Sequence, residues 1–65
     1  MKTEYDKDVD AAYIYIREIK KGDVKKTVAI APEVNIDVGE KDEILGIEIL
    51  NVKTKKHAMK ELAKI

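Results

Sequence analysis

An acidic run near the N-terminus places carboxylates at alternate positions, as a calcium-binding loop does. Asp6, Asp8 and Asp10 would supply the first, third and fifth positions of such a loop. The loop also needs a glycine at its sixth position and a bidentate glutamate at its twelfth, but here those positions hold Ala11 and Arg17. Aspartates are common in turns because their side chains bond nearby backbone amides. The run therefore predicts a turn that orients two strand ends, with a weak surface cation site as the alternative.

Few side chains in this sequence could act as nucleophiles, metal ligands or acid–base catalysts. Cysteine is absent, which excludes disulfides and thiolate metal sites, and serine is absent as well. His57 is the single histidine, and at helical spacing only Glu61 could join it as a ligand. Two ligands do not complete a zinc site, and an isolated histidine has no partner to orient it for acid–base catalysis. We therefore predict that the protein is not an enzyme and has no catalytic residue, metal or cofactor.

Two tyrosines and one acid are candidates for contacts with a partner. Tyr13 and Tyr15 project from the same side of a predicted strand, and an aromatic patch on a small protein often marks a partner surface. Glu48 lies in the most apolar stretch, where a carboxylate is rarely buried unpaired. It is either an outward acid or one that pairs with Arg17 or a lysine of a neighbouring strand. The alternative is a buried or interface glutamate whose pairing fixes register or dimer geometry. The predicted interface consists of Tyr13, Tyr15, Glu48 and Leu50.

Lysines gather in two parts of the sequence and form a candidate basic patch. The 13 basic and 13 acidic residues give a net charge of zero, so bulk charge does not favour nucleic acid. Arg17 is the single arginine, and without Phe or Trp only three tyrosines could stack on bases. Lysines on hairpin edges also prevent edge-to-edge aggregation. A small basic-tailed nucleic-acid-binding protein is therefore the alternative function. The patch consists of Lys20, Lys21, Lys25, Lys26, Lys55 and Lys56.

Apolar and polar residues alternate with a period of two over the first 52 residues, which indicates β-strands. Gly22 can take the positive φ of a tight turn, so residues 20–23 are predicted to form a hairpin tip. Pro32 cannot donate a backbone hydrogen bond and is predicted to end a strand. Gly46 is predicted to let backbone or a tyrosine ring approach closely. The predicted strands cover residues 2–5, 11–19, 24–31, 34–38 and 44–52, and an amphipathic helix follows over residues 55–64.

These elements predict a single α+β domain over residues 1–65. It consists of a small antiparallel sheet of about five strands in meander-like order, with the C-terminal helix packed on one face. Hydrophobic residues make up 45% and charged residues 40% of the chain, as in a soluble globular domain. No apolar run approaches the roughly 20 residues of a membrane helix. The N-terminus lacks the apolar stretch of a secretory signal, so we expect a cytoplasmic protein. Abundant Lys, Glu and Ile without Cys, Ser or Gln are typical of thermophilic proteins.

Several short motifs resemble, in order and spacing, a family of small prokaryotic proteins, the domain-of-unknown-function 2283 family. They are Tyr5-Asp6 with Asp10, Tyr13-Ile14-Tyr15-Ile16, Val34-Asn35-Ile36-Asp37-Val38 and Gly46-Ile47-Glu48-Ile49-Leu50. The resemblance covers about residues 2–52. Where the family often has an Asp-x-Asp-Gly turn before the last strand, residues 39–43 read Gly-Glu-Lys-Asp-Glu. The resemblance implies a small β-rich fold without an established activity. Because some relatives are encoded beside toxin-like proteins, it also implies a partner-binding or antitoxin-like role.

The uncovered face of the predicted sheet leads to the functional expectation. If the helix covers the aliphatic face, the tyrosines and part of the last strand stay on the other side, and exposed patches of this kind often bind a partner. Twofold dimers are the commonest assemblies of identical chains. We therefore expect a non-enzymatic protein-interaction module that acts as a homodimer and uses its tyrosine-bearing face or a sheet edge.

Overall fold

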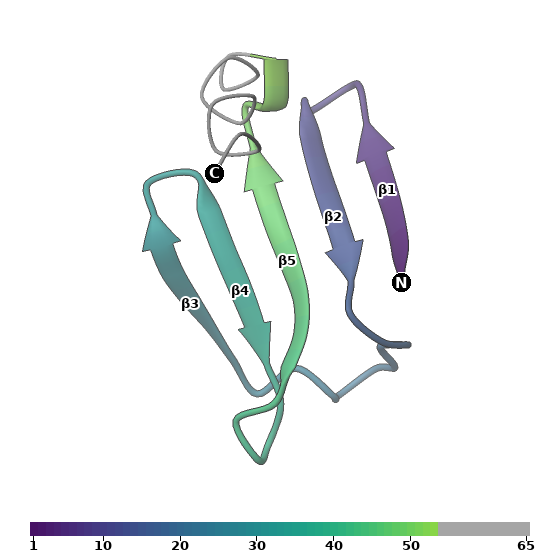
Figure 1. Cartoon of the computed structure of the whole chain (residues 1–65), viewed down its shortest axis with the longest axis vertical. Helices are drawn as coiled ribbons and strands as arrows, with labels where there is room; N and C mark the ends of the chain where they lie inside the picture. The colour runs from purple at the N-terminus through teal and green to yellow at the C-terminus, as the bar shows by residue number, and fades with distance from the viewer. Residues whose placement is uncertain (54–65) are drawn as a thin grey trace.

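A computed structural model describes residues 1–53, which form one antiparallel sheet of five strands (Figure 1). No helix among these residues is long and apolar enough to cross a membrane. In chain order the strands are β1 (Lys2–Asp6), β2 (Ala11–Tyr15), β3 (Lys26–Ala31), β4 (Val34–Val38) and β5 (Ile44–Leu50).

The strands lie in the order β1-β2-β5-β4-β3. β1 and β2 form a hairpin, and β3, β4 and β5 form a meander whose last strand pairs with β2. Residues 16–25 carry the chain from β2 to the opposite edge of the sheet, below the ends of β5 and β4 in Figure 1. The predicted meander-like strand order is therefore wrong between β2 and β3. These strands are not neighbours, so residues 20–23 are not the tip of a hairpin.

β5 lies at the centre of the sheet because it is the strand with apolar residues on both faces. A strand with apolar side chains on both faces is typical of the interior of a sheet. β3 is an edge strand, and all six of its residues are exposed. Lys25 and Lys26 precede and open β3, and charged residues of this type protect a sheet edge from pairing with other chains.

The register divides the sheet into two faces of different chemistry. On one, which we call the aliphatic face, pairing across the sheet aligns two rows. The first row is Thr3, Ile14, Ile47, Ile36 and Val28, and the second is Tyr5, Ala12, Ile49, Val34 and Ala31. On the other, which we call the tyrosine face, one row is Glu4, Tyr13, Glu48, Asn35 and Ala29, and the other is Lys2, Tyr15, Gly46, Asp37 and Thr27.

Two bulges interrupt this register. Between the pairs Asp37–Gly46 and Val38–Ile44, β5 contains Leu45 as an extra residue. Leu45 is the one fully buried large side chain of the described residues, and Val38 is the other buried aliphatic one. In β3 the extra residue is Ile30, so Ala31 stands opposite Val34. A period of two over residues 24–31 would place Val28 and Ile30 on one side and Ala31 on the other, and this alternation ends at the bulge.

The predicted α+β class is wrong for the described part of the chain, which is an all-β sheet of five strands. The predicted helix over residues 55–64 lies outside the described residues. β2 ends at Tyr15 although its predicted range runs to residue 19. The alternation continues past Tyr15, but only the backbone amide of Ile16 still bonds to the central strand, at the carbonyl of Leu45 (2.9 Å).

Several turns agree with their predictions. The aspartate run links β1 and β2, and within it the Asp6 carboxylate accepts a hydrogen bond from the amide of Asp8 (2.9 Å). Pro32 follows the end of β3, and two residues separate β3 from β4. Gly22 has a φ of +88°, as expected of a turn glycine. These are local features that one or two residue types decide.

Candidate functional site

The four predicted interface residues lie on the tyrosine face, on the adjacent strands β2 and β5. Tyr13 stands opposite Glu48, Tyr15 opposite Gly46, and Leu50 opposite Ala11. Period-two alternation placed each residue on its face. The pairing of β2 with β5 then brings the two tyrosines of β2 next to Glu48 and Leu50 of β5. That pairing could not be expected from the sequence, which does not reveal strand order.

Tyr13 is held by a hydrogen-bond chain that crosses three strands. Its hydroxyl donates to Oδ2 of Asp37 on β4 (2.5 Å), and Oδ1 of Asp37 accepts a hydrogen bond from the Thr27 hydroxyl on β3 (2.6 Å). Burial, followed by the hydrogen bond to the Asp37 carboxylate, raises the pKa of the Tyr13 hydroxyl well above its ordinary value. Tyr13 therefore stays protonated and acts as a fixed donor. Asp37 and Thr27 were not predicted as site residues, because alternation marked them only as outward positions.

Gly46 leaves room for the ring of Tyr13. A Cβ atom at Gly46 would lie 2.5 Å from Cζ of Tyr13, closer than side chains approach one another. The expected close approach of a tyrosine ring to Gly46 is thus confirmed, and the tyrosine is Tyr13. Covering a strand glycine with a neighbouring aromatic ring is a known way to stabilise a sheet at that position.

Tyr15 forms a second polar cluster at the free edge of the sheet. Its ring centroid lies 4.7 Å from that of Tyr13, with the ring planes 56° apart. Nζ of Lys2 lies 5.3 Å from the Tyr15 centroid and 3.4 Å from Oε1 of Glu4. A hydrogen bond with Tyr15 and then the charge of Lys2 lower the pKa of Glu4, and the same bond raises the pKa of Tyr15. The cluster places an ammonium between an aromatic ring and a carboxylate.

Glu48 is half-buried on β5 and accepts a hydrogen bond from Nδ2 of Asn35 on β4 (3.1 Å). The suggested pairing with Arg17 is wrong, because the Arg17 guanidinium lies 3.3 Å from Oε2 of Glu43. Glu48 is therefore partnered by an amide of its own sheet. Its role in dimer geometry stays a prediction.

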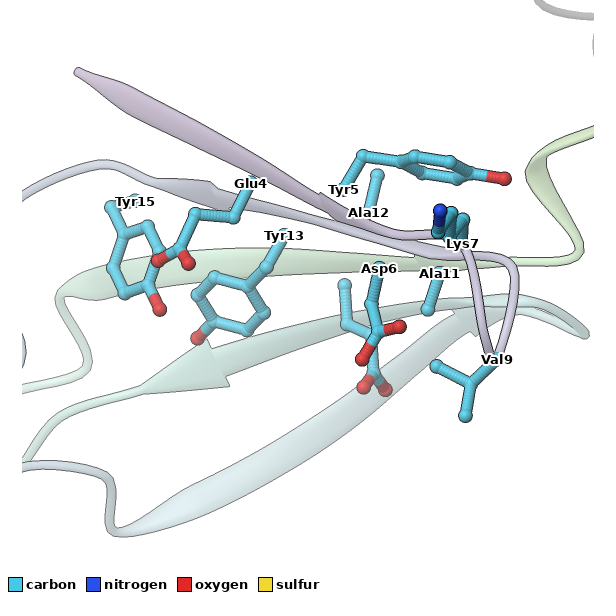
Figure 2. Close-up of a pocket in the computed structure, with 10 residues that line it drawn as sticks. Glu4, Tyr5, Asp6, Lys7, Val9, Ala11, Ala12, Tyr13 and Tyr15 are labelled. Carbon is cyan, nitrogen blue, oxygen red and sulfur yellow. The ribbon is translucent and has the colours of Figure 1, made fainter.

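A hollow of about 710 Å³ opens beside the two tyrosines. In Figure 2, Glu4, Asp6, Tyr13 and Tyr15 lie on the same side of the β1–β2 hairpin, and Tyr5 lies on the other. The volume is within the range of small-ligand sites, but the hollow is wide open to solvent. Its lining residues are Glu4, Tyr5, Asp6, Lys7, Val9, Ala11, Ala12, Tyr13, Tyr15 and Glu48.

The aliphatic face is the second candidate surface. Its central isoleucines are half-buried, and large apolar side chains toward its edges are exposed, with Val28 at 42% and Tyr5 at 46%. Within residues 1–53, every extensive contact between strands joins neighbours in the same sheet. The predicted helix was expected to cover this face, so docking was predicted elsewhere. The signal in the sequence was the alternation of Ile and Val within single strands, and strand pairing joins these residues into one face.

The acidic turn is tied to its surroundings by its own side chains. Oδ1 of Asp10 accepts a hydrogen bond from the Tyr5 hydroxyl (2.8 Å), and both its carboxylate oxygens lie 3.3 Å from the amide of Lys53. Asp10 itself has a φ of +53°. Its side chain thus joins the hairpin to the end of the described chain, in agreement with the predicted orienting turn. Among residues 1–53, no three histidine, aspartate or glutamate side chains converge as metal ligands.

Only four of the six lysines of the basic patch lie within residues 1–53, the part of the chain that the structure describes. Lys20, Lys21 and Lys25 lie in the connection between β2 and β3, and Lys26 opens β3. Nζ of Lys26 lies 3.0 Å from Oδ1 of Asp42, so an acid neutralises part of its charge. The other two members of the patch, Lys55 and Lys56, and the single histidine, His57, lie outside the described residues.

Comparison with known proteins gives a family but no activity. No curated protein and no solved structure matched the chain. The family model described as "protein of unknown function (DUF2283)" matches residues 2–53. That range contains all five strands and both surfaces described above. The chain therefore belongs to the DUF2283 family.

Proposed function

We propose that this protein is a non-enzymatic protein-interaction module that acts as a homodimer, with two sheets packed through their aliphatic faces. The observation that carries the proposal is the aliphatic face of the sheet, which no other element of residues 1–53 covers. An antiparallel sheet with one apolar face is stable when that face packs on another layer. An antitoxin-like role, in which the outward faces hold a second small protein, is compatible with this arrangement.

The size of the aliphatic face favours a second copy as the other layer. Strands about 4.8 Å apart that rise about 3.3 Å per residue give five short strands a face of roughly 400 Å². That is comparable with the largest apolar patch of an ordinary monomer. Two such faces have a flat area of roughly 800 Å², and the relief of their side chains adds to it, so the interface is at or below the small end of specific interfaces, about 1,200 Å² in total. The proposal therefore implies a dimer of moderate affinity.

The polar contacts of the tyrosine face support this choice between the two faces. Tyr13, Asp37, Asn35 and Glu48 already have hydrogen-bond partners within their own sheet, so packing a second sheet on them would displace water from charged groups. Aliphatic side chains carry no such cost, and burying them contributes about 25 cal/mol per Å². The dimer thus forms through the opposite face from the one that the sequence favoured, and the tyrosine face stays outward.

Sedimentation equilibrium of a matched pair of variants tests the dimer. Val28→Glu places a carboxylate on the aliphatic face at an exposed position. Ala29→Glu places the same group one residue further along the same edge strand, on the tyrosine face opposite Asn35. We expect the wild type and Ala29→Glu to sediment as dimers at tens of micromolar, and Val28→Glu to dissociate at least about tenfold more readily, the equivalent of about 1.4 kcal/mol.

A monomeric wild type at millimolar concentration would refute the proposal, as would an equal effect of the two substitutions. Circular dichroism of both variants shows whether each is folded. The alternative, a small basic-tailed nucleic-acid-binding protein, predicts that a labelled DNA duplex binds at low salt and dissociates steeply as salt increases. The same preparations can be titrated with that duplex.

A further inference from the structure

The hollow beside the tyrosines borders an unpaired strand. β1 is an edge of the sheet, so along its outer side the backbone N–H and C=O groups have no partner strand among residues 1–53. Residues Lys2, Glu4 and Asp6 of β1 share the tyrosine face with Tyr13 and Tyr15 of β2. An extended peptide that added to β1 would therefore place every second side chain next to the hollow.

The charge of the hollow selects for cations. Its lining includes three carboxylates, those of Glu4, Asp6 and Glu48, but one ammonium, that of Lys7. The hydrogen bond from Tyr15 and the nearby Lys2 lower the pKa of Glu4, so this carboxylate is ionised at neutral pH. The Tyr13 hydroxyl already donates to Asp37, and the Tyr15 ring lies beside the Tyr13 ring, so ring faces form part of the recognition surface. Ring faces attract ammonium and guanidinium groups.

Lys2 does not line the hollow, but it contacts two residues that do and shows how they hold a cation. Nζ of Lys2 lies 5.3 Å from the Tyr15 ring centroid and 3.4 Å from the Glu4 carboxylate. This is the environment that a basic side chain of a neighbouring strand would enter. Lys2 is largely exposed, with 71% of its side chain accessible. An incoming cation could therefore replace it without disturbing the sheet.

From these observations we propose that the outer edge of β1 and the tyrosine hollow together bind an extended basic peptide segment of a partner protein. Lysine or arginine side chains at every second position of the segment contact Tyr15 and Glu4, and its backbone pairs with β1. This inference rests on the proposed function as an interaction module and specifies the chemistry of its partner. It does not require the dimer, because the aliphatic face is on the other side of the sheet.

The test is a titration of the ¹⁵N-labelled full chain, followed by NMR, with a short capped peptide of alternating lysine and threonine. We expect saturable shifts of the β1 and β2 amides, a Kd of about 0.1 to 1 mM, and weaker binding as salt increases. A peptide with glutamate in place of lysine is the matched ligand control. Equal shifts with both peptides, or none with either, would overturn the proposal.

Variants separate the hollow from general attraction between charges. Glu4→Gln and Tyr15→Leu should each weaken binding at least about fivefold, whereas Tyr15→Phe, which keeps the ring, should retain most of it. Glu40→Gln removes an exposed acid of the distant β4–β5 turn and should leave the Kd unchanged. An effect of Glu40→Gln as large as that of Glu4→Gln would contradict a defined site.

Two further arms identify the ligand class and keep the two proposals independent. Spermidine carries amines but cannot pair with a strand, so it should bind more weakly and leave the β1 amides unshifted; tight spermidine binding would overturn the peptide assignment.

The titration is repeated on Val28→Glu. If the wild type proves monomeric and the lysine peptide still binds, the dimer is refuted and the peptide site stands. If the wild type is a dimer that fails to bind the peptide, the peptide site is refuted and the dimer stands.

Discussion

Two of the three tyrosines donate their hydroxyl hydrogen to a carboxylate of the same chain, and the third has a carboxylate beside it. Tyr5 donates to Asp10 and Tyr13 to Asp37, and Glu4 is the acid that raises the pKa of Tyr15. In each case the neighbouring negative charge opposes ionisation, and the pKa of the tyrosine is raised. At the residue scale, Tyr5 and Tyr13 are therefore anchored donors, a form suited to recognition and not to proton transfer near neutral pH.

Removing the Tyr13 hydroxyl measures how much the hydrogen bonds that link Tyr13, Asp37 and Thr27 stabilise the sheet. Tyr13→Phe keeps the ring over Gly46 but leaves Asp37 with Thr27 as its remaining side-chain donor. Because Tyr13 is part-buried and its partner is charged, we expect the free energy of unfolding to fall by about 1 to 2 kcal/mol. Urea denaturation measures this loss. Thr27→Val, at the exposed end of the chain, should cost less, and the opposite order would contradict the central role of Tyr13.

The same tyrosine makes stability depend on alkaline pH. Because its pKa is higher in the folded chain than the ordinary value near 10, the unfolded chain releases this proton first as pH rises. The stability that protonated Tyr13 contributes is thus fully present below about pH 10 and is lost as the pH increases above that value. We expect unfolding in urea between about pH 9 and 11 to show a steeper decline for the wild type than for Tyr13→Phe. Parallel curves would show that Tyr13 does not carry the effect.

Gly46 supplies a third prediction at the residue scale. Gly46→Ala forces the Tyr13 ring to move, and the move breaks its bond to Asp37, so we expect a loss of about 1 to 3 kcal/mol. Tyr13→Leu removes both the clash and the hydroxyl. In a double-mutant cycle, Gly46→Ala should therefore cost much less in the Tyr13→Leu background. Additive free energies of unfolding would mean that the ring does not press on this glycine.

At the scale of elements, the β4–β5 turn departs from the Asp-x-Asp-Gly form expected of the family. The amide of Gly39 bonds to the carbonyl of Glu43 (2.9 Å), and the amide of Asp42 to the carbonyl of Gly39 (3.2 Å). Asp42 takes a φ of +61°, the conformation that glycine adopts most readily. Here an aspartate occupies the left-handed position, so the turn is closed at the expense of backbone strain.

Replacing that aspartate should stabilise the hairpin. Asp42→Gly relieves a left-handed backbone that costs an ordinary residue about 1 to 2 kcal/mol, and glycine's greater freedom in the unfolded chain offsets part of the gain. The exposed ion pair with Lys26 adds little. We expect a net increase in the free energy of unfolding of about 0.5 kcal/mol by urea denaturation. Lys41→Gly, whose φ is not positive, should destabilise, and a gain from both substitutions would contradict this account.

The sequence predicted the five strands, their faces and most turns, because these depend on nearby residues. Val34 to Val38 alternates strictly, and the structure keeps that alternation. The order of strands could not be predicted, since nothing local distinguishes a hairpin at residues 20–23 from a connection that crosses to the far edge. The bulges at Ile30 and Leu45 were hidden for a similar reason: a bulge is a mismatch between two strands, and each strand alone looks regular.

For the candidate site, too, the sequence predicted which face each residue occupies but not which residues become neighbours. Tyr13 and Tyr15 were assigned to the correct face, and Glu48 was marked by its apolar surroundings. Its partner was missed because Asn35 becomes a neighbour only when β4 and β5 pair. The hollow also depends on the free edge of β1, which is a property of strand order.

At the scale of the whole molecule, one sheet presents two surfaces with separate chemistry. The aliphatic face can be covered without disturbing the tyrosine face, because side chains on opposite faces of a strand do not meet. A face-to-face pair would stack the sheets about 10 Å apart and leave two tyrosine faces outward, one on each side. Two identical sites on one particle would bind a partner with repeated basic segments far more tightly than either site alone.

If the second layer is another copy, stability must depend on protein concentration. Folding is then coupled to association, and a tenfold increase in concentration favours the folded dimer by about 1.4 kcal/mol. For chains of this size that corresponds to a rise in Tm of roughly 3 to 6 °C, measured by circular dichroism. Val28→Glu, which blocks the aliphatic face, should show a lower Tm that no longer changes with concentration. Ala29→Glu should keep the wild-type dependence, because its carboxylate points to the other side. A wild-type Tm that stays constant over a hundredfold range would mean that the sheet is stabilised within a single chain, and the aliphatic face would then not be the dimer interface.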